Sequence, residues 1–541
     1  MSRKLLVTSA LPYANGHIHI GHLVEYMQTD IWVRFQKSIG NRAHYICASD
    51  THGTPIMINA QKRGVTPEEL VETFRKKHQE DFKGFHIEFD HYGSTHSDSN
   101  RKLSEAFYLA AKDKGAIYEK EIDQLYSEKD EMFLPDRFVK GTCPECGAED
   151  QYGDSCEKCG ATYSPQDLVN PYSVVSGDRP VMKSSDHYFY KLSQFESEIQ
   201  AWLGEGRVCE EARKKLKEWF SEGLRDWDIS RDEPYFGFKI PGTDNKYFYV
   251  WLDAPVGYIA STFDWCQDKS LTDEIWKSGD WEIHHFIGKD ILYFHCLFWP
   301  AMLTAAEYAL PTKINIHGFL TVNGEKMSKS RGTFIMASTY LEHLDPDFLR
   351  YYYASKLSPQ IEDLDLNLEN FVFKINSDVL GKVINIASRL ASIVYKKCDA
   401  TLGNVDEEGQ VLIDKIRAEA KAIQAGYENL EYSKTMKQIM NCAAEINKYI
   451  DDKAPWALVK EDVDAARTVC TVGLTGLVTL CIYLAPVMPR ITRDLAAFLG
   501  VDDLSFSQLE RSIEGITVEK YKHVAARLEQ EQVDSILGNL D

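Results

Sequence analysis

The first 115 residues alternate short apolar runs with longer amphipathic ones. The runs "LLVTSA" (5–10) and "AHYICASD" (43–50) have the length and composition of strands. The runs "HLVEYMQTDIWVRFQ" (22–36) and "TPEELVETFRKKHQEDF" (66–82) repeat apolar positions at helical spacing. This alternation predicts βαβ units, and therefore a parallel sheet that binds a ligand at the carboxyl ends of its strands.

The pattern then changes twice. From about residue 116 to 230 the chain is rich in Cys, Gly, Pro and charged turns, which predicts an inserted domain. Strand-like runs resume near Tyr247, as "KYFYVWLDAP", "WEIHHFIGKDI" and "KINIHGFLTV". From Asp345 onward the pattern is mainly that of amphipathic helices, for example "FVFKINSDVLGKVINIASRLASIVYKK".

The predicted fold is therefore an α/β protein: a Rossmann-like parallel sheet split by an insert and followed by an α-helical bundle. We expect the following division: first half of the sheet domain 1–115, insert 116–230 with a knuckle at about 141–162, second half of the sheet domain 231–325, a lysine loop and connecting region 326–385, helical domain 386–515, and C-terminal peptide 516–541.

Composition fits a chain of several domains. Its 541 residues are 44% hydrophobic, and its net charge of −21 argues against a general polyanion binder, although a local basic patch is compatible with it. The start "MSRKLLVTSA" resembles a signal peptide, but Thr8 and Ser9 break the short apolar run, so an opening strand is expected. The apolar run 472–489 carries Thr, Gly and Pro and is expected to be a buried bundle helix. We expect a cytoplasmic protein without a membrane span.

Four of the twelve cysteines form the strongest metal signal. "CPEC" and "CEKC" place Cys143, Cys146, Cys156 and Cys159 in two knuckles nine residues apart. Four thiolates at this spacing complete a tetrahedral site for one structural Zn²⁺ per chain. The remaining cysteines are scattered, as in a reducing compartment.

A second group of candidate residues is the histidine run in "SALPYANGHIHIGHLVEY" (9–26), which includes His17, His19 and His22. It follows a strand and a glycine turn and precedes a helix, an arrangement that offers free N–H groups to a phosphate. A metal site would need further ligands, and only Glu25 lies close in sequence. We interpret the run as a nucleotide site and assign no role to His17.

A third signal is "NGEKMSKSRGTF" (323–334), where Lys326 and Lys329 lie between two glycines. Such a loop suits a mobile clamp on polyphosphate. Taken alone, it is equally an ordinary charged surface loop.

Taken together, "HIGH" (19–22) and "KMSKS" (326–330) match both signature motifs of the class I aminoacyl-tRNA synthetases. The chain up to about residue 515 resembles methionyl-tRNA synthetase in "ALPYANGHIHIGH", "DTHGTPI", "FLPDRFVKGTCPECG", "WDISRD", "PYFGF", "YVWLDAP", "HFIGKDILYFH", "HGFLTVNGEKMSKSRGTF", "LRYYYASKLS" and "DKAPW".

This resemblance implies roles for individual residues. His19, His22, Lys326 and Lys329 would be catalytic. The methionine pocket would be lined by Ala10, Leu11, Tyr13, Asp50, Trp251, Ala254, Pro255, Tyr258, Ile291 and His295, with Asp50 on the α-amino group and Arg231 supporting this acidic side. ATP would lie near Asn15, Gly21, Lys289, Asp290 and Lys329, with Asp290 on the ribose. Without the resemblance, Trp251 and Tyr258 would be core aromatics at a strand end.

The implied activity is methionine–tRNA ligation. The methionine carboxylate attacks the α-phosphorus of ATP, which is bound with Mg²⁺, and pyrophosphate leaves. Methionine then passes to the 3′-terminal adenosine of tRNA(Met), initiator and elongator, with the 2′-hydroxyl reacting first. The resemblance points to Asn385, Arg389 and Trp456 as readers of the anticodon CAU; on charge alone, the basic stretch around them is a solvated helix face.

Three alternatives belong to other classes. A cysteine, leucine, isoleucine or valine ligase shares the two motifs, although residues 116–230 leave little room for the editing insert of the last three. A tRNA-free adenylyltransferase would lack the helical domain, and a non-catalytic RNA-binding paralogue would not need both motifs. We expect a monomer, and a homodimer only if a C-terminal dimerisation domain extends the natural protein beyond residue 541.

Overall fold

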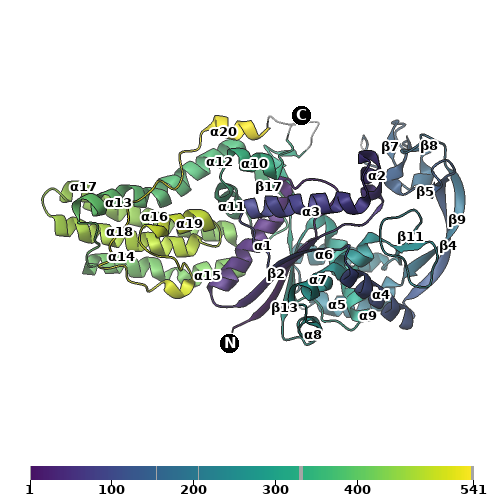
Figure 1. Ribbon diagram of the computed structural model, residues 1–541, viewed down its shortest axis with the longest axis horizontal. Coiled ribbons are helices and arrows are strands. Elements are labelled where there is room, and N and C mark those ends of the chain that lie inside the picture. The colour runs from purple at the N-terminus through teal and green to yellow at the C-terminus, as the bar shows by residue number, and fades with distance from the viewer. Residues whose placement is uncertain are drawn as a thin grey trace.

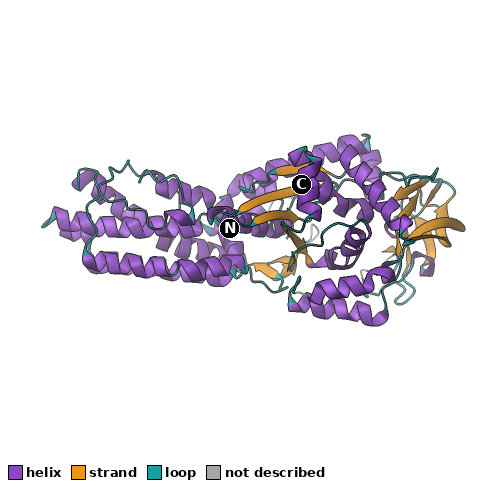
Figure 2. Cartoon of the chain, turned by 90° about the horizontal axis from the view of Figure 1, so that it is seen from below, coloured by secondary structure: helices purple, strands orange, loops and turns teal. Residues whose placement is uncertain are grey.

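The computed structural model describes residues 2–153, 155–156, 158–161, 163–204, 206–327 and 333–537. The molecule is elongated, with a bundle of helices at one end, a β-rich insert at the other and a parallel sheet between them (Figure 1). Viewed from below, the strands of the insert again gather at the end opposite the bundle (Figure 2). This order of parts confirms the predicted fold class.

The central sheet has five parallel strands in the order β14-β13-β1-β2-β3. Their bounds are β1 (Lys4–Ser9), β2 (Arg42–Ser49), β3 (His91–Ser94), β13 (Glu282–Gly288) and β14 (Lys313–His317). The chain order reverses between β1 and β13, where β1 is followed by β2 on one side and by the later strands on the other. In a doubly wound sheet, a crevice opens beyond the carboxyl ends of the strands at this point.

Both faces of the sheet are covered by helices. Leu5 and Val7 of β1 belong to one apolar core and Leu6 to another, as alternation along a strand requires. The helices of this part are α1 (Ile20–Ser38), α2 (Thr54–Arg63), α3 (Pro67–Gly84), α4 (Asp98–Asp113), α7 (Val250–Cys266), α8 (Lys269–Lys277) and α9 (Trp299–Ala305).

One predicted strand is wrong in part. In "KYFYVWLDAP" the strand β12 (Lys246–Phe248) ends early, and helix α7 begins at Val250. Trp251 therefore lies in the first turn of a helix and not at a strand end. Eleven consecutive residues of α7, from Leu252 to Thr262, are buried. A helix buried all round is a continuous apolar run, which periodicity cannot distinguish from a buried strand.

The insert contains two antiparallel sheets. One has the order β10-β9-β4-β5, and the other, whose strands lie before, between and after the two cysteine knuckles, has the order β7-β6-β8. The bounds are β4 (Ile117–Ser127), β5 (Met132–Phe133), β6 (Val139–Thr142), β7 (Gln151–Tyr152), β8 (Val169–Ser173), β9 (Val181–Tyr190), β10 (Trp227–Asp228) and, beyond the insert, β11 (Ser230–Asp232), which pairs with β12.

Helices α5 (Glu196–Gly204) and α6 (Glu210–Glu222) fall inside the range 116–230 but share their apolar core with the parallel sheet. The division into domains stays a prediction, and these two helices pack with the catalytic part.

The lysine loop connects the sheet with the bundle. Its neighbours are β15 (Leu320–Val322), β16 (Glu325–Lys326), β17 (Leu364–Leu366), α10 (Ala337–His343), α11 (Pro346–Ala354) and α12 (Leu368–Lys374). The predicted long helix from about Phe371 is present, but residues Ile375–Ile384 form π-type turns before α13 continues it. Near the C-terminus, α20 (Gln530–Asp534) returns to pack on α12 (Figure 1).

The bundle is built around one apolar helix. Its members are α13 (Asn385–Lys397), α14 (Glu407–Ala418), α15 (Ala420–Glu428), α16 (Tyr432–Lys453), α17 (Pro455–Leu458), α18 (Val463–Leu484) and α19 (Pro489–Ala497). Among the described helices, α18 is the one long and apolar enough to cross a membrane, yet 83% of its apolar window is buried against other helices. Its role as a buried bundle helix was predicted from its Thr and Gly content.

A buried arginine joins the bundle to the sheet. Arg350 of α11 is fully buried and donates to the Asp30 carboxylate of α1 at 2.6 Å. It also donates to the carbonyl oxygens of Phe85, Pro486 and Val487. One side chain thus connects α1, the turn after α3 and the turn after α18.

Asp347, at the start of the same helix, lowers the stability of the folded protein at neutral pH. It is fully buried; one carboxylate oxygen accepts from the Ile491 N–H at 2.8 Å and the other has no partner. Burial raises its pKa to about 6. Because the raised pKa favours the protonated form in the folded state, ionised Asp347 destabilises the fold above pH 6, and this cost falls as the pH drops toward 4.

Asp347→Asn should therefore raise the free energy of unfolding by about 1–3 kcal/mol at pH 8 and by much less at pH 4.5. Urea unfolding at the two pH values measures the difference. The exposed Asp502→Asn is the control and should show no such dependence. An equal gain at both pH values would contradict the electrostatic explanation.

Candidate active site

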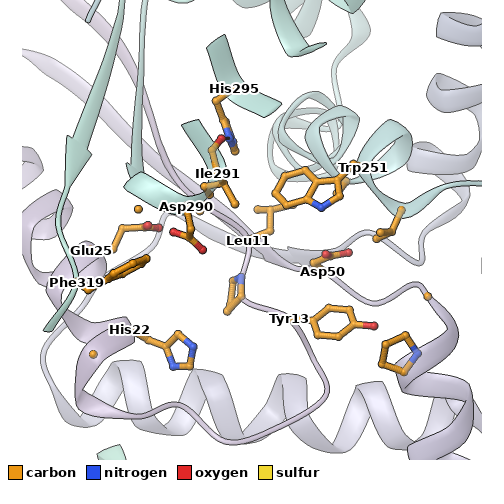
Figure 3. Close-up of a pocket in the computed structure, with 18 of the residues that line it drawn as sticks. Leu11, Tyr13, His22, Glu25, Asp50, Trp251, Asp290, Ile291, His295 and Phe319 are labelled. Carbon is orange, nitrogen blue, oxygen red and sulfur yellow. Dashed lines mark hydrogen bonds between the residues drawn. The ribbon is translucent and has the colours of Figure 1, made fainter. Parts of the chain in front are cut away.

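A cavity of about 870 Å³ opens at the carboxyl edge of the parallel sheet. Its walls come from the segments that follow β1, β2, β13 and β14, together with the start of α7 and residues Lys326 and Met327. Figure 3 shows side chains from these segments pointing toward one another across it. The site thus lies at the carboxyl ends of the parallel strands, as predicted, and at the point where the strand order reverses.

All ten residues assigned to the methionine pocket line this cavity. They are Ala10, Leu11, Tyr13, Asp50, Trp251, Ala254, Pro255, Tyr258, Ile291 and His295. Phe294 stacks on Trp251 with ring centroids 3.9 Å apart and nearly parallel planes. The Tyr258 hydroxyl lies 2.9 Å from His295 Nε2, and burial lowers the pKa of His295 to about 4, so its ring is neutral. These contacts form a rigid, aromatic-walled slot.

Asp50 is the acidic group of the slot. Its Oδ1 is buried and has no hydrogen-bond partner. Burial, and then the nearby charge of Asp253, raise the pKa of Asp50 well above its ordinary value. An arriving ammonium group would satisfy the free oxygen and restore the carboxylate. The geometry fits the predicted contact with an α-amino group.

The two motif histidines cap helix α1. His19 is the N-cap, and its Nδ1 accepts from the Gly21 N–H at 3.1 Å. His22 Nδ1 accepts from the His19 N–H at 3.1 Å, and the two rings stack 3.6 Å apart. A nitrogen that accepts carries no proton, so each neutral ring carries its proton on Nε2.

Both rings are held in this neutral form. Burial lowers the pKa of His19 to about 4, and burial together with the neighbouring histidines lowers the pKa of His22 well below its ordinary value. His22 is reached by solvent from the cavity, although protein surrounds it closely. Two N–H donors at the positive end of a helix suit a phosphate better than a metal ion.

Two described residues at the start of the lysine loop, Lys326 and Met327, line one side of the cavity. Lys326, at the end of β16, is exposed and lines the cavity beside Met327. Met327 reaches the start of α1, because its Cε lies 2.3 Å from where a Cβ on Gly21 would be. Lys329 lies outside the described residues, so its predicted position is not tested.

Two predicted nucleotide residues do not line the cavity. Lys289 pairs with Asp363 at 2.5 Å and lies over the Phe319 ring, whereas Asn15 accepts from Asn59 at 2.8 Å. Gly21 and Asp290 do line it. Arg231, which was expected to support the acidic side, also lines the cavity, where it stacks on Tyr249 at 3.9 Å.

A buried ion pair was missed at the sequence level. Glu25 Oε2 lies 3.3 Å from His317 Nε2, and both line the cavity beside Asp290. Burial raises the pKa of Glu25; burial would lower that of His317, but the Glu25 carboxylate outweighs it and the His317 pKa is raised. The sequence signals were the position of Glu25 close to the histidine run and the glycine after His317, at the end of a strand-like run.

The four knuckle cysteines come together in the insert. Their sulfur atoms all lie within 4.8 Å of one another, with Cys143–Cys159 at 3.8 Å and Cys146–Cys156 at 3.6 Å. Four sulfurs bound to one tetrahedral ion at 2.3 Å would be about 3.8 Å apart. Gly147 and Gly160 close the two knuckles with positive φ angles of 71° and 77°. The group can hold a metal ion.

The predicted anticodon readers meet at the far end of the bundle, on α13 and α17 (Figure 1). The Arg389 guanidinium lies over the Trp456 ring at 4.6 Å and pairs with Asp451 at 2.5 Å. Asn385, one turn before Arg389, contacts Asn447 at 3.4 Å. Trp456 is 43% exposed, so its ring is available for stacking.

Comparisons with known proteins agree with this arrangement. The family described as "tRNA synthetases class I (M)" matches residues 5–391, and the family described as "Anticodon binding domain of methionyl tRNA ligase" matches residues 400–533. The second match extends beyond residue 515, into the segment expected to be a C-terminal peptide.

Named relatives and solved structures point the same way. Methionine–tRNA ligase of Leptospira biflexa serovar Patoc is 51% identical over 98% of this chain and 78% of its own length; that of Thiobacillus denitrificans is 52% identical over 99% and 78%. The fold resembles that of Mycobacterium tuberculosis methionyl-tRNA synthetase in complex with methionyl-adenylate, with a TM-score of 0.81, 24% identity, and 97% and 99% of the two chains covered. The chain belongs to the methionyl-tRNA synthetase family of class I tRNA synthetases.

Proposed function

We propose that this protein is a methionine–tRNA ligase. It activates L-methionine with ATP to methionyl-adenylate, releases pyrophosphate, and transfers methionine to the 3′-terminal adenosine of tRNA(Met), initiator and elongator. The observation that carries this proposal is that one cavity combines the methionine-pocket residues, both motif histidines and Lys326, the first motif lysine. The cytoplasmic location and the monomeric state stay predictions.

Methionine is bound by the shape of the slot and by one charged group, the Asp50 carboxylate. The unbranched thioether enters the slot walled by Leu11, Tyr13 and Trp251, where sulfur–ring contacts contribute about 0.3–1.5 kcal/mol each. Asp50 accepts the α-ammonium group through its unpartnered oxygen. Branched aliphatic side chains lack the reach to fill such a slot, which favours methionine over valine or isoleucine.

Adenylation needs positioning and not a protein nucleophile. A methionine carboxylate oxygen forms a bond to the α-phosphorus as the bond to the bridging oxygen of the β-phosphate breaks, and the electron pair leaves with pyrophosphate. The Nε2–H groups of His19 and His22 donate to phosphate oxygens at the start of α1. Lys326 and Lys329 neutralise the charge on the leaving group, Asp290 binds the ribose, and Mg²⁺ accompanies ATP.

Transfer of methionine to the tRNA follows in the same cavity. The 2′-hydroxyl of the terminal adenosine attacks the carbonyl carbon of the adenylate, and AMP leaves. Asn385, Arg389 and Trp456 read the anticodon by hydrogen bonding and stacking, which is how splayed bases of single-stranded RNA loops are bound.

Methionine-dependent exchange of labelled pyrophosphate into ATP, without tRNA, tests the proposal. Cysteine, leucine, isoleucine and valine are run beside it. Exchange with methionine alone is expected. Exchange with another amino acid would overturn the pocket assignment, and no exchange with any of them would favour a non-catalytic RNA-binding protein.

The four knuckle thiolates hold one structural Zn²⁺ per chain. The sulfur separations fit a tetrahedral ion, and four protein ligands leave no open position for chemistry. We expect about one zinc per chain by atomic emission, and much less in Cys146→Ser. Proteolysis within residues 141–161 should become faster in that variant, because the ion connects the two knuckles. Cys209→Ser, outside the cluster, is the control, and equal zinc in all three proteins would contradict the assignment.

A further inference from the structure

Two buried polar residues lie behind the methionine cavity and have not yet been given a role. His52 comes two residues after Asp50, in the loop that follows β2, and Asp253 lies in the first turn of α7. Both side chains are fully buried, and neither lines the cavity. Any effect of the two residues on the cavity therefore passes through their neighbours.

The two residues form a short hydrogen bond. His52 Nδ1 lies 2.5 Å from Asp253 Oδ2, and His52 Nε2 lies 3.0 Å from His96 Nδ1. Because a carboxylate only accepts, His52 donates from Nδ1. The rings of Phe236 and Phe238 meet the His52 ring edge-on, at 5.4 and 4.5 Å. Packing thus locks the imidazole in one orientation.

This bond connects the two walls of the cavity. The segment 50–55 contributes Asp50, and the segment 250–258 contributes Trp251 and Pro255; Asp50 and Trp251 face each other in Figure 3. Among the hydrogen bonds of the described residues, His52–Asp253 is the one that joins these segments directly. Other bonds from each segment lead to a third part of the chain, such as Asn100, which donates to the Asp253 carbonyl.

Within the described part of the chain, the His52–Asp253 pair has no hydrogen bond to the part of the cavity that faces the nucleotide. The start of α1 and the turn after β13 approach the cavity from other strands, and neither contacts His52 or Asp253 by a hydrogen bond among those described. Loss of the bond would alter the width of the methionine slot and leave the phosphate-facing groups in place.

We propose that His52 and Asp253 form a positioning pair that fixes the distance between the Asp50 wall and the Trp251 wall, and so sets the affinity for methionine. This inference rests on the proposed function, because it names the amino-acid side of that site. Neither residue touches the substrate.

Two substitutions of His52 separate the Nδ1 bond from the rest of the ring. The amide nitrogen of asparagine reaches roughly the position of Nδ1, whereas that of glutamine reaches roughly that of Nε2. His52→Gln should therefore raise the KM for methionine about tenfold, with the KM for ATP within about twofold of wild type. His52→Asn should keep the KM for methionine within about threefold. The measurement is pyrophosphate exchange at varied methionine and varied ATP.

Asp253 gives a second test, which also serves if His52→Gln does not fold. Asp253→Asn keeps an oxygen that accepts from His52 and should bind methionine nearly as wild type does, whereas Asp253→Ala should resemble His52→Gln. His44→Gln, at a half-buried histidine of β2 whose ring packs on Trp265, controls for loss of an imidazole.

The outcomes are distinct. An unchanged KM for methionine in His52→Gln and Asp253→Ala would overturn the inference, as would an equal rise in both KM values, since that indicates general loosening. His52→Asn behaving like His52→Gln would overturn the role of Nδ1. A wild-type protein without methionine-dependent exchange would instead refute the proposed function.

Discussion

His22→Asn should lower kcat for methionine-dependent pyrophosphate exchange by about 10²–10³, with little change in stability. His22 contributes two things: its Nδ1 accepts from the His19 N–H, and its Nε2–H is free to donate to phosphate. The asparagine oxygen reaches roughly the Nδ1 position and preserves the helix cap, but no donor remains at the Nε2 position. Losing one preorganised donor to developing charge costs about 3–4 kcal/mol of transition-state stabilisation.

His17→Asn is the matched control. His17 lies outside the motif, with its ring edge-on to Phe74 at 5.3 Å, and has no assigned role. We expect its kcat within about twofold of wild type. Initial rates at saturating methionine and ATP measure kcat, and thermal unfolding checks the fold. A His22→Asn enzyme with near wild-type kcat would refute the donor role.

The protonation states add a second expectation to this experiment. Burial keeps the pKa of His19 at about 4 and that of His22 well below its ordinary value, so both rings are neutral above pH 6. Their N–H donors are therefore present throughout the range from pH 6 to 8. A loss of kcat over that range that disappears in His22→Asn would show that a charged imidazolium is needed instead.

Arg350→Met should destabilise the protein by about 3–5 kcal/mol, the largest effect on stability that we expect. The guanidinium donates four hydrogen bonds, to Asp30 and to three carbonyl oxygens, with no exposed surface. Methionine has a similar length but donates nothing. Removing one partner of a buried ion pair leaves the other charge and the carbonyl groups without their bonds.

Asp30 keeps a second partner, which limits the loss. Arg34 donates to it at 2.7 Å, and together the two arginines hold the pKa of Asp30 below its usual value in spite of its burial. The bundle should be affected more than Asp30, because the substitution removes the hydrogen bonds from Arg350 to the carbonyl oxygens of Pro486 and Val487. Unfolding should then begin at the junction between α11 and the turn after α18.

Urea unfolding followed by circular dichroism measures the change in free energy. Arg493→Met is the control. Because the Arg493 side chain is 68% exposed, this substitution should change the free energy of unfolding by less than about 0.5 kcal/mol. A loss below about 1 kcal/mol in Arg350→Met would mean that the junction does not depend on this side chain.

The sequence alone predicted the features that depend on residues close together along the chain. Helix α1 begins at Ile20, directly after a strand and a glycine turn, because the residues that cap a helix are its own neighbours. The knuckles at Cys143 and Cys156 were recognisable because each closes within four residues, and the family resemblance then assigned roles to residues scattered along the chain. All ten pocket residues so assigned lie around one cavity.

Local sequence patterns did not predict those features that depend on contacts between residues far apart in the sequence. The apolar run around Trp251 is helical because α7 is enclosed on every side, and no periodicity records that enclosure. Lys289 is paired with Asp363, 74 positions away, and so does not line the cavity. The Glu25–His317 pair joins residues 292 positions apart.

Sequence by itself therefore determined the order of the parts, the motif elements, the metal-binding knuckles and the family. Tertiary structure decided which side chains share a cavity, the tautomers of His19 and His22, the buried bond between His52 and Asp253, and the role of Arg350 at the junction. The physical reason is that capping, turn and knuckle geometries depend on neighbours along the chain. Burial, ion pairing and pKa depend on which distant segments folding brings together.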